Sequence, residues 1–134
     1  MAFLVSGDID AVRRALALVA LPLFVLLLAG CGVPHELSKQ AEEVESVAAE
    51  ASLLAHDAGE DSTTATFTRE HAKALRKLLR QVEPAIENPG LSRIAQQVDR
   101  SLAELADDPG DEKRAQQLEQ DLDKASKAAG ELAG

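Results

Sequence analysis

The chain has 134 residues and a formal net charge of −9, a length that accommodates one small domain. The acidic balance disfavours nucleic-acid binding, which normally needs a basic surface. Trp and Tyr are absent and there are only three Phe, which argues against base-stacking platforms and aromatic-lined pockets. The single cysteine excludes an internal disulfide and any metal site that is built from several cysteines.

An uninterrupted apolar run, ALALVALPLFVLLL, occupies residues 15–28, and Arg13 and Arg14 precede it. A short apolar segment that follows positive charge and ends in small residues is typical of a secretory signal peptide. The run is shorter than the roughly 20 apolar residues that cross a bilayer as a helix. We therefore expect residues 1–30 to be a signal peptide.

The run ends in Leu28, Ala29, Gly30 and Cys31, and this tetrapeptide resembles the lipobox of bacterial lipoproteins. The resemblance covers residues 12–32. It implies cleavage between Gly30 and Cys31, and a diacylglycerol on the Cys31 thiol, with a further acyl chain on the new amino group in some members. It also implies a lipid-anchored protein on the extracytoplasmic face of a cell membrane, inner or outer. The alternatives are an uncleaved anchor and an exported protein with a chance cysteine.

Two features of the leader leave alternatives open. Asp8 and Asp10 oppose the positive charge that a signal peptide normally carries at its start. Either the leader is long, or translation begins at Val12, because a GTG codon can initiate in bacteria. Arg13 and Arg14 also suit twin-arginine export, but nothing downstream calls for export of a folded protein, so general secretion is favoured.

Beyond residue 33, apolar residues recur at intervals of three and four, and no alternating run occurs, which predicts an all-α fold. We expect four helices, at about residues 34–58, 68–87, 89–106 and 109–129. The expected core-facing residues are, in chain order, Leu37, Ala41, Val44, Val47, Ala48, Ala51, Leu54, Ala55 and Ala58; Ala72, Leu75, Leu78, Leu79, Val82 and Ile86; Leu91, Ala95, Val98, Leu102 and Leu105; and Ala115, Leu118, Leu122, Ala125 and Ala129.

Polar residues, prolines and glycines predict where these helices begin and end. Thr66 or Thr68 is the expected N-cap of the second helix, and Asn88 and Asp108, each followed by Pro-Gly, are the expected N-caps of the third and fourth. The expected terminators are Gly59 and Gly130, which suit helix C-caps, and Pro84, which removes a backbone hydrogen bond.

Short connections between amphipathic helices favour an antiparallel four-helix bundle. The expected domains are a signal peptide at 1–30, a lipidated tether at 31–33 and a helical domain at 34–134. Because the core-facing positions are rich in Ala, and each Ala buries little area, the alternative is a helical hairpin that completes its core as a homodimer.

Charged residues at helical spacing predict one helix pairing. Acidic residues repeat every seven positions in the first helix, and basic residues recur at intervals of four and three in the second: Glu36, Glu43, Glu50 and Asp57; Arg69, Lys73, Arg76 and Arg80. An antiparallel hairpin brings these two flanks together and helps to set its register. The alternative is two solvated faces of opposite sign.

The remaining candidates for chemistry are His56 and His71, which end the first helix and begin the second. With Glu60, Asp61 and Glu70 nearby, they are weak candidates for a metal site, and exposed histidines are the alternative. No catalytic motif or phosphate loop occurs, so we expect neither an enzyme nor a cofactor.

These observations favour a membrane-anchored, extracytoplasmic lipoprotein. Its helical domain is expected to be a non-catalytic interaction or structural module of the cell envelope, held by the lipid on Cys31. A protein of the envelope is the expected partner, and nucleic acid is not. The alternative function is a tethered bundle that binds a small ligand or a metal.

Overall fold

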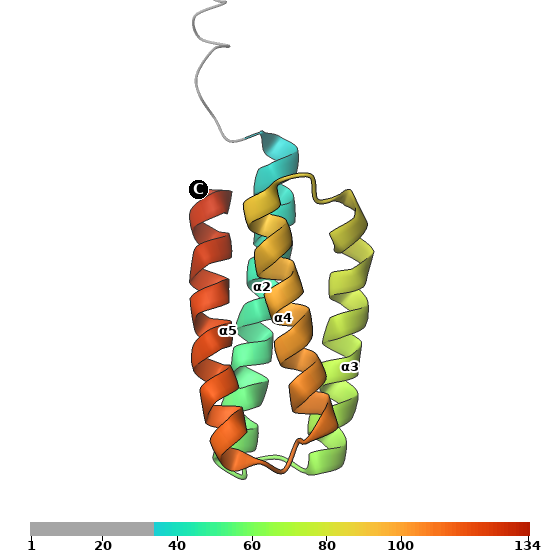
Figure 1. The fold of residues 1–134 in the computed structure, drawn as a ribbon, viewed down its shortest axis with the longest axis vertical. Coiled ribbons are helices and arrows are strands. Elements are labelled where there is room, and N and C mark those ends of the chain that lie inside the picture. Colours follow the sequence, from blue (N-terminus) through green and yellow to red (C-terminus); the bar gives the residue numbers. More distant parts are fainter. Residues whose placement is uncertain (1–33) are drawn as a thin grey trace, which may run out of the picture. The chain divides into compact units, whose positions relative to one another are not determined.

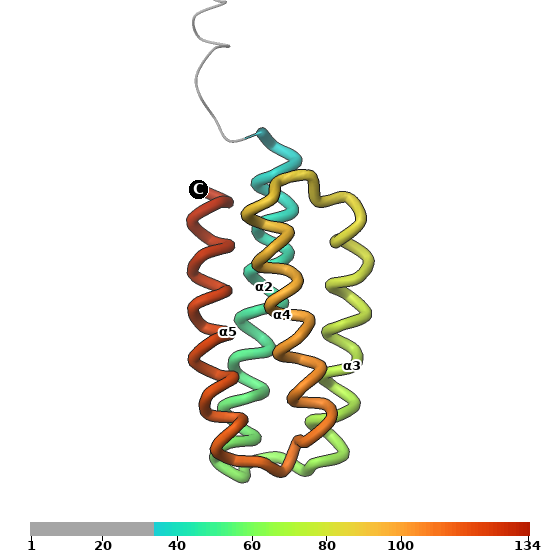
Figure 2. The backbone as a smooth tube through the Cα atoms, in the orientation of Figure 1, coloured from blue at the N-terminus to red at the C-terminus, as the bar shows by residue number. Residues whose placement is uncertain are grey.

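A computed structural model describes residues 34–134 of the chain. The helices in this part are α2 (His35–Gly59), α3 (Ala65–Val82), α4 (Pro89–Asp107) and α5 (Glu112–Ala133), and a 3-10 turn, η1 (Glu83–Ala85), follows α3. They run alternately up and down (Figure 1), and the backbone tube in Figure 2 follows the short connections. The expected all-α antiparallel four-helix bundle is confirmed.

Each helix packs against the helix that follows it, and α5 returns to pack along α2, which closes the bundle. Nearly all the expected core positions are buried, including every one expected in α4 and α5. Those left partly buried are Leu37, Val47, Val82 and Ile86. Leu78 differs, since 51% of it is exposed. One chain thus builds a closed core of its own, which the hairpin alternative would have needed a second copy to complete.

The α2–α5 interface is lined by small residues, and the two backbones approach closely along it. In three places a serine hydroxyl of one helix donates to a backbone carbonyl of the other, at distances of 2.8, 3.2 and 3.4 Å: Ser38 to Ala133, Ser52 to Glu119, and Ser126 to Glu45. A serine side chain is short, so these hydrogen bonds form only because no larger side chain separates the helices.

Two glycines serve this close approach and do not cap helices as the sequence suggests. Gly59 is the last residue of α2 and has no positive φ; the left-handed residue is Asp61, with a φ of 54°. A Cβ on Gly59 would lie 3.0 Å from the Cγ of Gln116 in α5. Gly130 lies inside α5, where a Cβ would lie 2.9 Å from a carboxylate oxygen of Glu45. The first helix therefore does end at Gly59, with Glu60 as its C-cap, whereas the expected terminator Gly130 is wrong because α5 continues to Ala133.

The N-caps follow the expected chemistry but not always at the expected residue. Asn88 caps α4 as expected, its side chain accepting from the N–H of Leu91 at 3.0 Å. The cap of α3 is Thr64, which accepts from the N–H of Phe67 at 3.2 Å, and the expected Thr66 and Thr68 lie inside the helix. At the other end, α3 stops at Val82 and Pro84 lies in η1, as expected of a helix-ending proline.

The expected cap of the last helix, Asp108, is also wrong. Asp108 is the C-cap of α4, and its N–H donates to the carbonyl of Glu104 at 3.1 Å. Its own carbonyl accepts from the N–H of Asp111 across Pro109-Gly110 at 3.4 Å. This is a β-turn with Asp at its first and Pro at its second position, where both are favoured. Because the turn uses residues 108–111, the side chain of Asp111 caps α5 and accepts from the N–H of Arg114 at 3.0 Å.

Thr68 provides a test of the core. Its side chain is fully buried in the first turns of α3, and its hydroxyl has no hydrogen-bond partner among the described residues. Valine has the same shape without the desolvated hydroxyl, so Thr68→Val should raise the free energy of unfolding by about 1 kcal/mol. Urea unfolding of a fragment of residues 34–134 measures this. The exposed Thr66→Val is the control, and a loss of stability in Thr68→Val would contradict the assignment.

Ala48 and Ala49 test the close approach of α2 and α5. Ala48 is fully buried and its neighbour Ala49 is exposed. Ala48→Leu forces extra methylene groups into a packed interface and should destabilise the fragment by about 1–3 kcal/mol. Ala49→Leu adds the same atoms to the surface and should change the stability by less than about 0.5 kcal/mol. Equal effects of the two substitutions in urea unfolding would mean that the interface has room to spare.

Candidate functional site

The expected cleavage motif and lipid site, Leu28, Ala29, Gly30 and Cys31, lie outside the described residues. Only residues 32–34 separate Cys31 from the start of α2 at His35, and three residues span at most about 11 Å when fully extended. None of the helices between residues 34 and 134 has the length and apolar character that a membrane span requires.

His56 and His71, the candidates for a metal site, have different partners. The Nδ1 of His56 lies 3.2 Å from a carboxylate oxygen of Glu119 in α5, and the Nε2 of His71 lies 2.8 Å from a carboxylate oxygen of Glu50 in α2. One histidine therefore faces α5 and the other joins α3 to α2. Within residues 34–134, no three His, Cys, Asp or Glu side chains gather as a metal site would need.

An open depression of about 200 Å³ surrounds His71, between α2 and α3. The ring of Phe67 stacks on the imidazole with centroids 5.3 Å apart. Leu53, Leu54 and Asp57 of α2 complete the lining, together with Glu50. The depression is largely apolar, with one imidazole and two carboxylates at its edge, and this set of groups suits the packing of another side chain.

The expected pairing of the acidic flank of α2 with the basic flank of α3 is wrong. The basic flank faces α4: Arg69 donates to the carbonyl of Ala106 at 3.1 Å, and Arg76 and Arg80 lie 3.0 and 3.7 Å from the carboxylate of Asp99. Lys73 pairs with Glu70 of its own helix. The physical reason is that α3 buries Leu75 and Leu79, and this rotation turns the arginines towards α4.

The Arg76–Asp99 pair is the least exposed ionic contact between helices among residues 34–134, because the two side chains are only 26% and 22% exposed. The Nε and one terminal nitrogen of Arg76 donate to the two carboxylate oxygens at 3.0 and 3.2 Å, in the two-pronged geometry that favours Arg with carboxylates. The hydrogen bonds that Arg76 donates to Asp99 hold the pKa of the Arg76 guanidinium above its ordinary value, and partial burial works in the opposite direction. The pair therefore fixes the register of α3 on α4.

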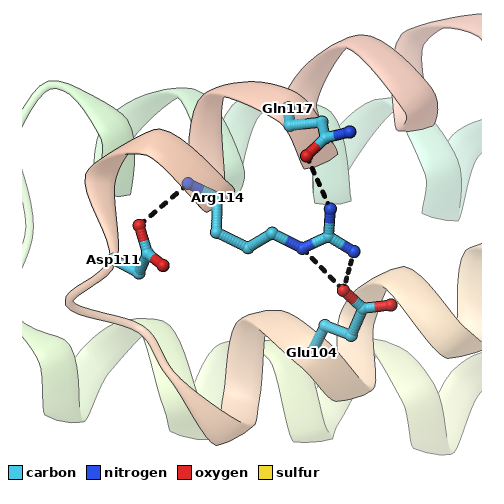
Figure 3. Close-up of polar contacts among 4 residues, drawn as sticks. All are labelled: Glu104, Asp111, Arg114 and Gln117. Atoms are coloured by element: carbon cyan, nitrogen blue, oxygen red, sulfur yellow. Dashed lines mark hydrogen bonds and ion pairs between the residues drawn. The ribbon is translucent and has the colours of Figure 1, made fainter.

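A second arginine joins α4 to α5 next to the turn at residues 108–111 (Figure 3). Arg114 donates through Nε to the carboxylate of Glu104 at 2.7 Å, and a terminal nitrogen donates to the side chain of Gln117 at 2.7 Å. Its own N–H is held by Asp111. These contacts are structural, because they tie the start of α5 to the end of α4.

In comparisons with protein-family models, with curated proteins and with solved structures, no match was found.

Two features of the surface were not expected from the sequence. The first is Asp99 as the partner of the arginines, although Asp99 directly follows the core residue Val98 and so lies at the edge of the α4 core stripe. The second is the exposure of Leu53 and Phe67, which are 61% and 54% exposed. Their position just outside the core stripes of α2 and α3 was the available signal.

Asp99→Asn tests the ionic contact between α3 and α4. The amide keeps the shape of the side chain but loses the charge, so we expect the free energy of unfolding to fall by about 1 kcal/mol. The control is Asp123→Asn, which removes an exposed pair with Lys127 and should change the stability little. An equal effect of the two substitutions in urea unfolding would contradict a special role for Asp99.

Proposed function

We propose that the chain is a lipid-anchored lipoprotein of a bacterial cell envelope, held at the extracytoplasmic face of a membrane through Cys31. In this proposal the helical domain is a non-catalytic module that binds a protein of the envelope or has a structural role there. The observation that carries the proposal is the motif Leu28-Ala29-Gly30-Cys31, placed directly after an apolar run with Arg13 and Arg14 before it.

The position of the bundle along the chain supports this proposal. The helical unit begins within a few residues of Cys31, so an anchored domain would stay close to its membrane. The start of α2 and the α3–α4 connection lie at one end of the bundle, and the other two connections lie at the opposite end (Figure 1). The longest helix, α2, has 25 residues and so measures about 37 Å. The end of the bundle opposite the start of α2, and the flanks, are therefore the surfaces that a partner would reach.

The character of the core supports a non-catalytic role. The buried polar side chains of residues 34–134 are Gln40, Thr68 and Ser101, and no titratable side chain is buried with them. Catalytic acids and bases are usually placed in concave, partly desolvated sites. The depressions on this bundle are open and lined by surface charges, as at Glu104 and Arg114 or at Glu36 and Glu87. Such surfaces suit contact with a macromolecule.

The test of the proposal is Cys31→Ser in bacteria fed with a radioactive fatty acid. The wild-type chain should take up label and sediment with membranes, because the thiol carries the lipid and two or more acyl chains give stable anchoring. Cys31→Ser should lose the label and either leave the membranes or accumulate with its leader uncleaved.

Val33→Ser is the matched control, because it changes a neighbouring residue and keeps the thiol. A wild-type chain that stays in membranes without label would indicate an uncleaved anchor. A wild-type chain that is released without label would indicate an ordinary exported protein. Either result would overturn the lipoprotein proposal.

A further inference from the structure

The exposed large apolar side chains of residues 34–134 gather on the side of the bundle formed by α2 and α3. They are Leu53, Phe67 and Leu78, and each is more than half exposed. Leu53 and Phe67 line the depression around His71. Leu78 lines a second depression, of about 310 Å³, with Val47 and Val82. The groove between the two helices is therefore apolar at two levels along its length.

The contact between His71 and Glu50 shows which residues of α2 and α3 lie side by side in the groove. It places residue 71 of α3 beside residue 50 of α2. Because the helices are antiparallel, Leu78 lies two turns further along α3 and beside Glu43, and both line the second depression. Exposed apolar side chains that gather in one groove are typical of a surface that contacts another molecule.

The two edges of the groove carry opposite charge. The charged residues on the α2 edge are acidic apart from Lys39, and they are Glu36, Glu43, Glu50 and Asp57. On the α3 edge, Glu70 holds Lys73 at 3.1 Å, while Lys77 is exposed and makes no ion pair within residues 34–134. Lys77 precedes Leu78, so it lies at about the level of Glu43.

A face with an apolar middle, one acidic edge and one basic edge is complementary to itself about a two-fold axis that runs along the groove. Such an axis places α2 of one copy over α3 of the other, and it leaves the position of each residue along the helix direction unchanged. Phe67 and Leu78 then meet their own counterparts near the axis, and Glu43 meets the Lys77 of the second copy. A two-fold axis across the groove would instead place α2 on α2 and oppose acid to acid, which is unfavourable.

Anchoring selects the same axis, and this step rests on the proposed function. An axis parallel to the helices keeps the start of α2 at the same end in both copies, so both lipids enter one membrane. An axis across the groove would direct the two anchors in opposite directions. Anchoring in one plane also raises the effective concentration of the copies, which lets a narrow interface associate.

We propose that a second copy of this chain docks on the α2–α3 groove about a two-fold axis parallel to the helices, with Phe67 and Leu78 in its centre and Glu43 opposite Lys77. The closed core of each bundle is retained, so the dimer joins complete domains. It leaves the α4–α5 side and the far end of each bundle free for another partner.

Disulfide formation between two full-length copies tests this arrangement. One copy carries Ser46→Cys and the other Lys77→Cys, with different tags, and membranes from cells that produce both are oxidised with copper phenanthroline. Both residues are exposed. They lie on the outer edges of α2 and α3 that the proposed axis superimposes. We expect a covalent product that carries both tags.

The matched control replaces Lys77→Cys with Lys124→Cys. Lys124 is also an exposed lysine and lies at nearly the same level as Ser46, because Ser126 of α5 donates to the carbonyl of Glu45. It is on α5, away from the groove, so this pair should give little product. In the original pair, Leu78→Ser in both copies should lower the product about tenfold through lost apolar burial.

Four results would overturn the proposal: no mixed product, equal product with Lys124→Cys, Ser46→Cys joined mainly to itself, or a product with a different protein. The unaltered chain, oxidised in parallel, detects disulfides through Cys31. Fatty-acid label on the same samples separates the two proposals. A mixed product without label would support the docking face and contradict the lipid anchor. Label without a mixed product would support the lipid anchor and contradict the docking face.

Discussion

The close approach of α2 and α5 is the constraint on which the rest of the bundle depends. Alanines line it, and the Ser52 hydroxyl reaches a carbonyl across it. Gly59 and Gly130 face side-chain atoms of the opposite helix, at positions where a Cβ would be crowded. An interface of this kind buries little area per residue, so its stability comes from many close backbone contacts and from dispersion. It tolerates changes in side-chain volume poorly, because it has almost no side chain to rearrange.

The other half of the bundle is built differently, and the exposed groove follows from this asymmetry. Leucines make up a larger share of the buried side chains of α3 and α4, as at Leu79 and Leu102, and larger side chains hold helices further apart. Because α5 occupies one flank of α2, and Arg76 and Arg80 of α3 turn to Asp99, the α2–α3 contact has no ion pair among residues 34–134 apart from Glu50 with His71. Its outer side chains, Phe67 among them, therefore stay exposed.

The fold was predictable from periodicity, because a core stripe at intervals of three and four residues specifies both a helix and its buried face. The roles of single residues were less predictable. Glycine suits both a helix C-cap and a close contact between helices. Only the position of α5 shows that Gly59 makes a close contact. Asp108 and Asp111 are equally good N-caps in sequence, and the turn between them leaves Asp111 as the N-cap of α5. The charged flanks were paired wrongly because periodicity gives the face of each helix but not its rotation towards a neighbour.

The candidate sites differ in the same way. The proposed lipid site at Cys31 rests on a local motif, because a signal peptide is recognised as one continuous stretch of sequence. A docking face is formed by two helices together, so no single segment of the sequence predicts it. The acidic repeat of α2 illustrates the difference. Within the bundle it meets His71 but not the arginines of α3, which Asp99 and Ala106 engage. The repeat therefore stays available on the surface, and a charged edge beside an apolar groove favours a partner with the opposite edge.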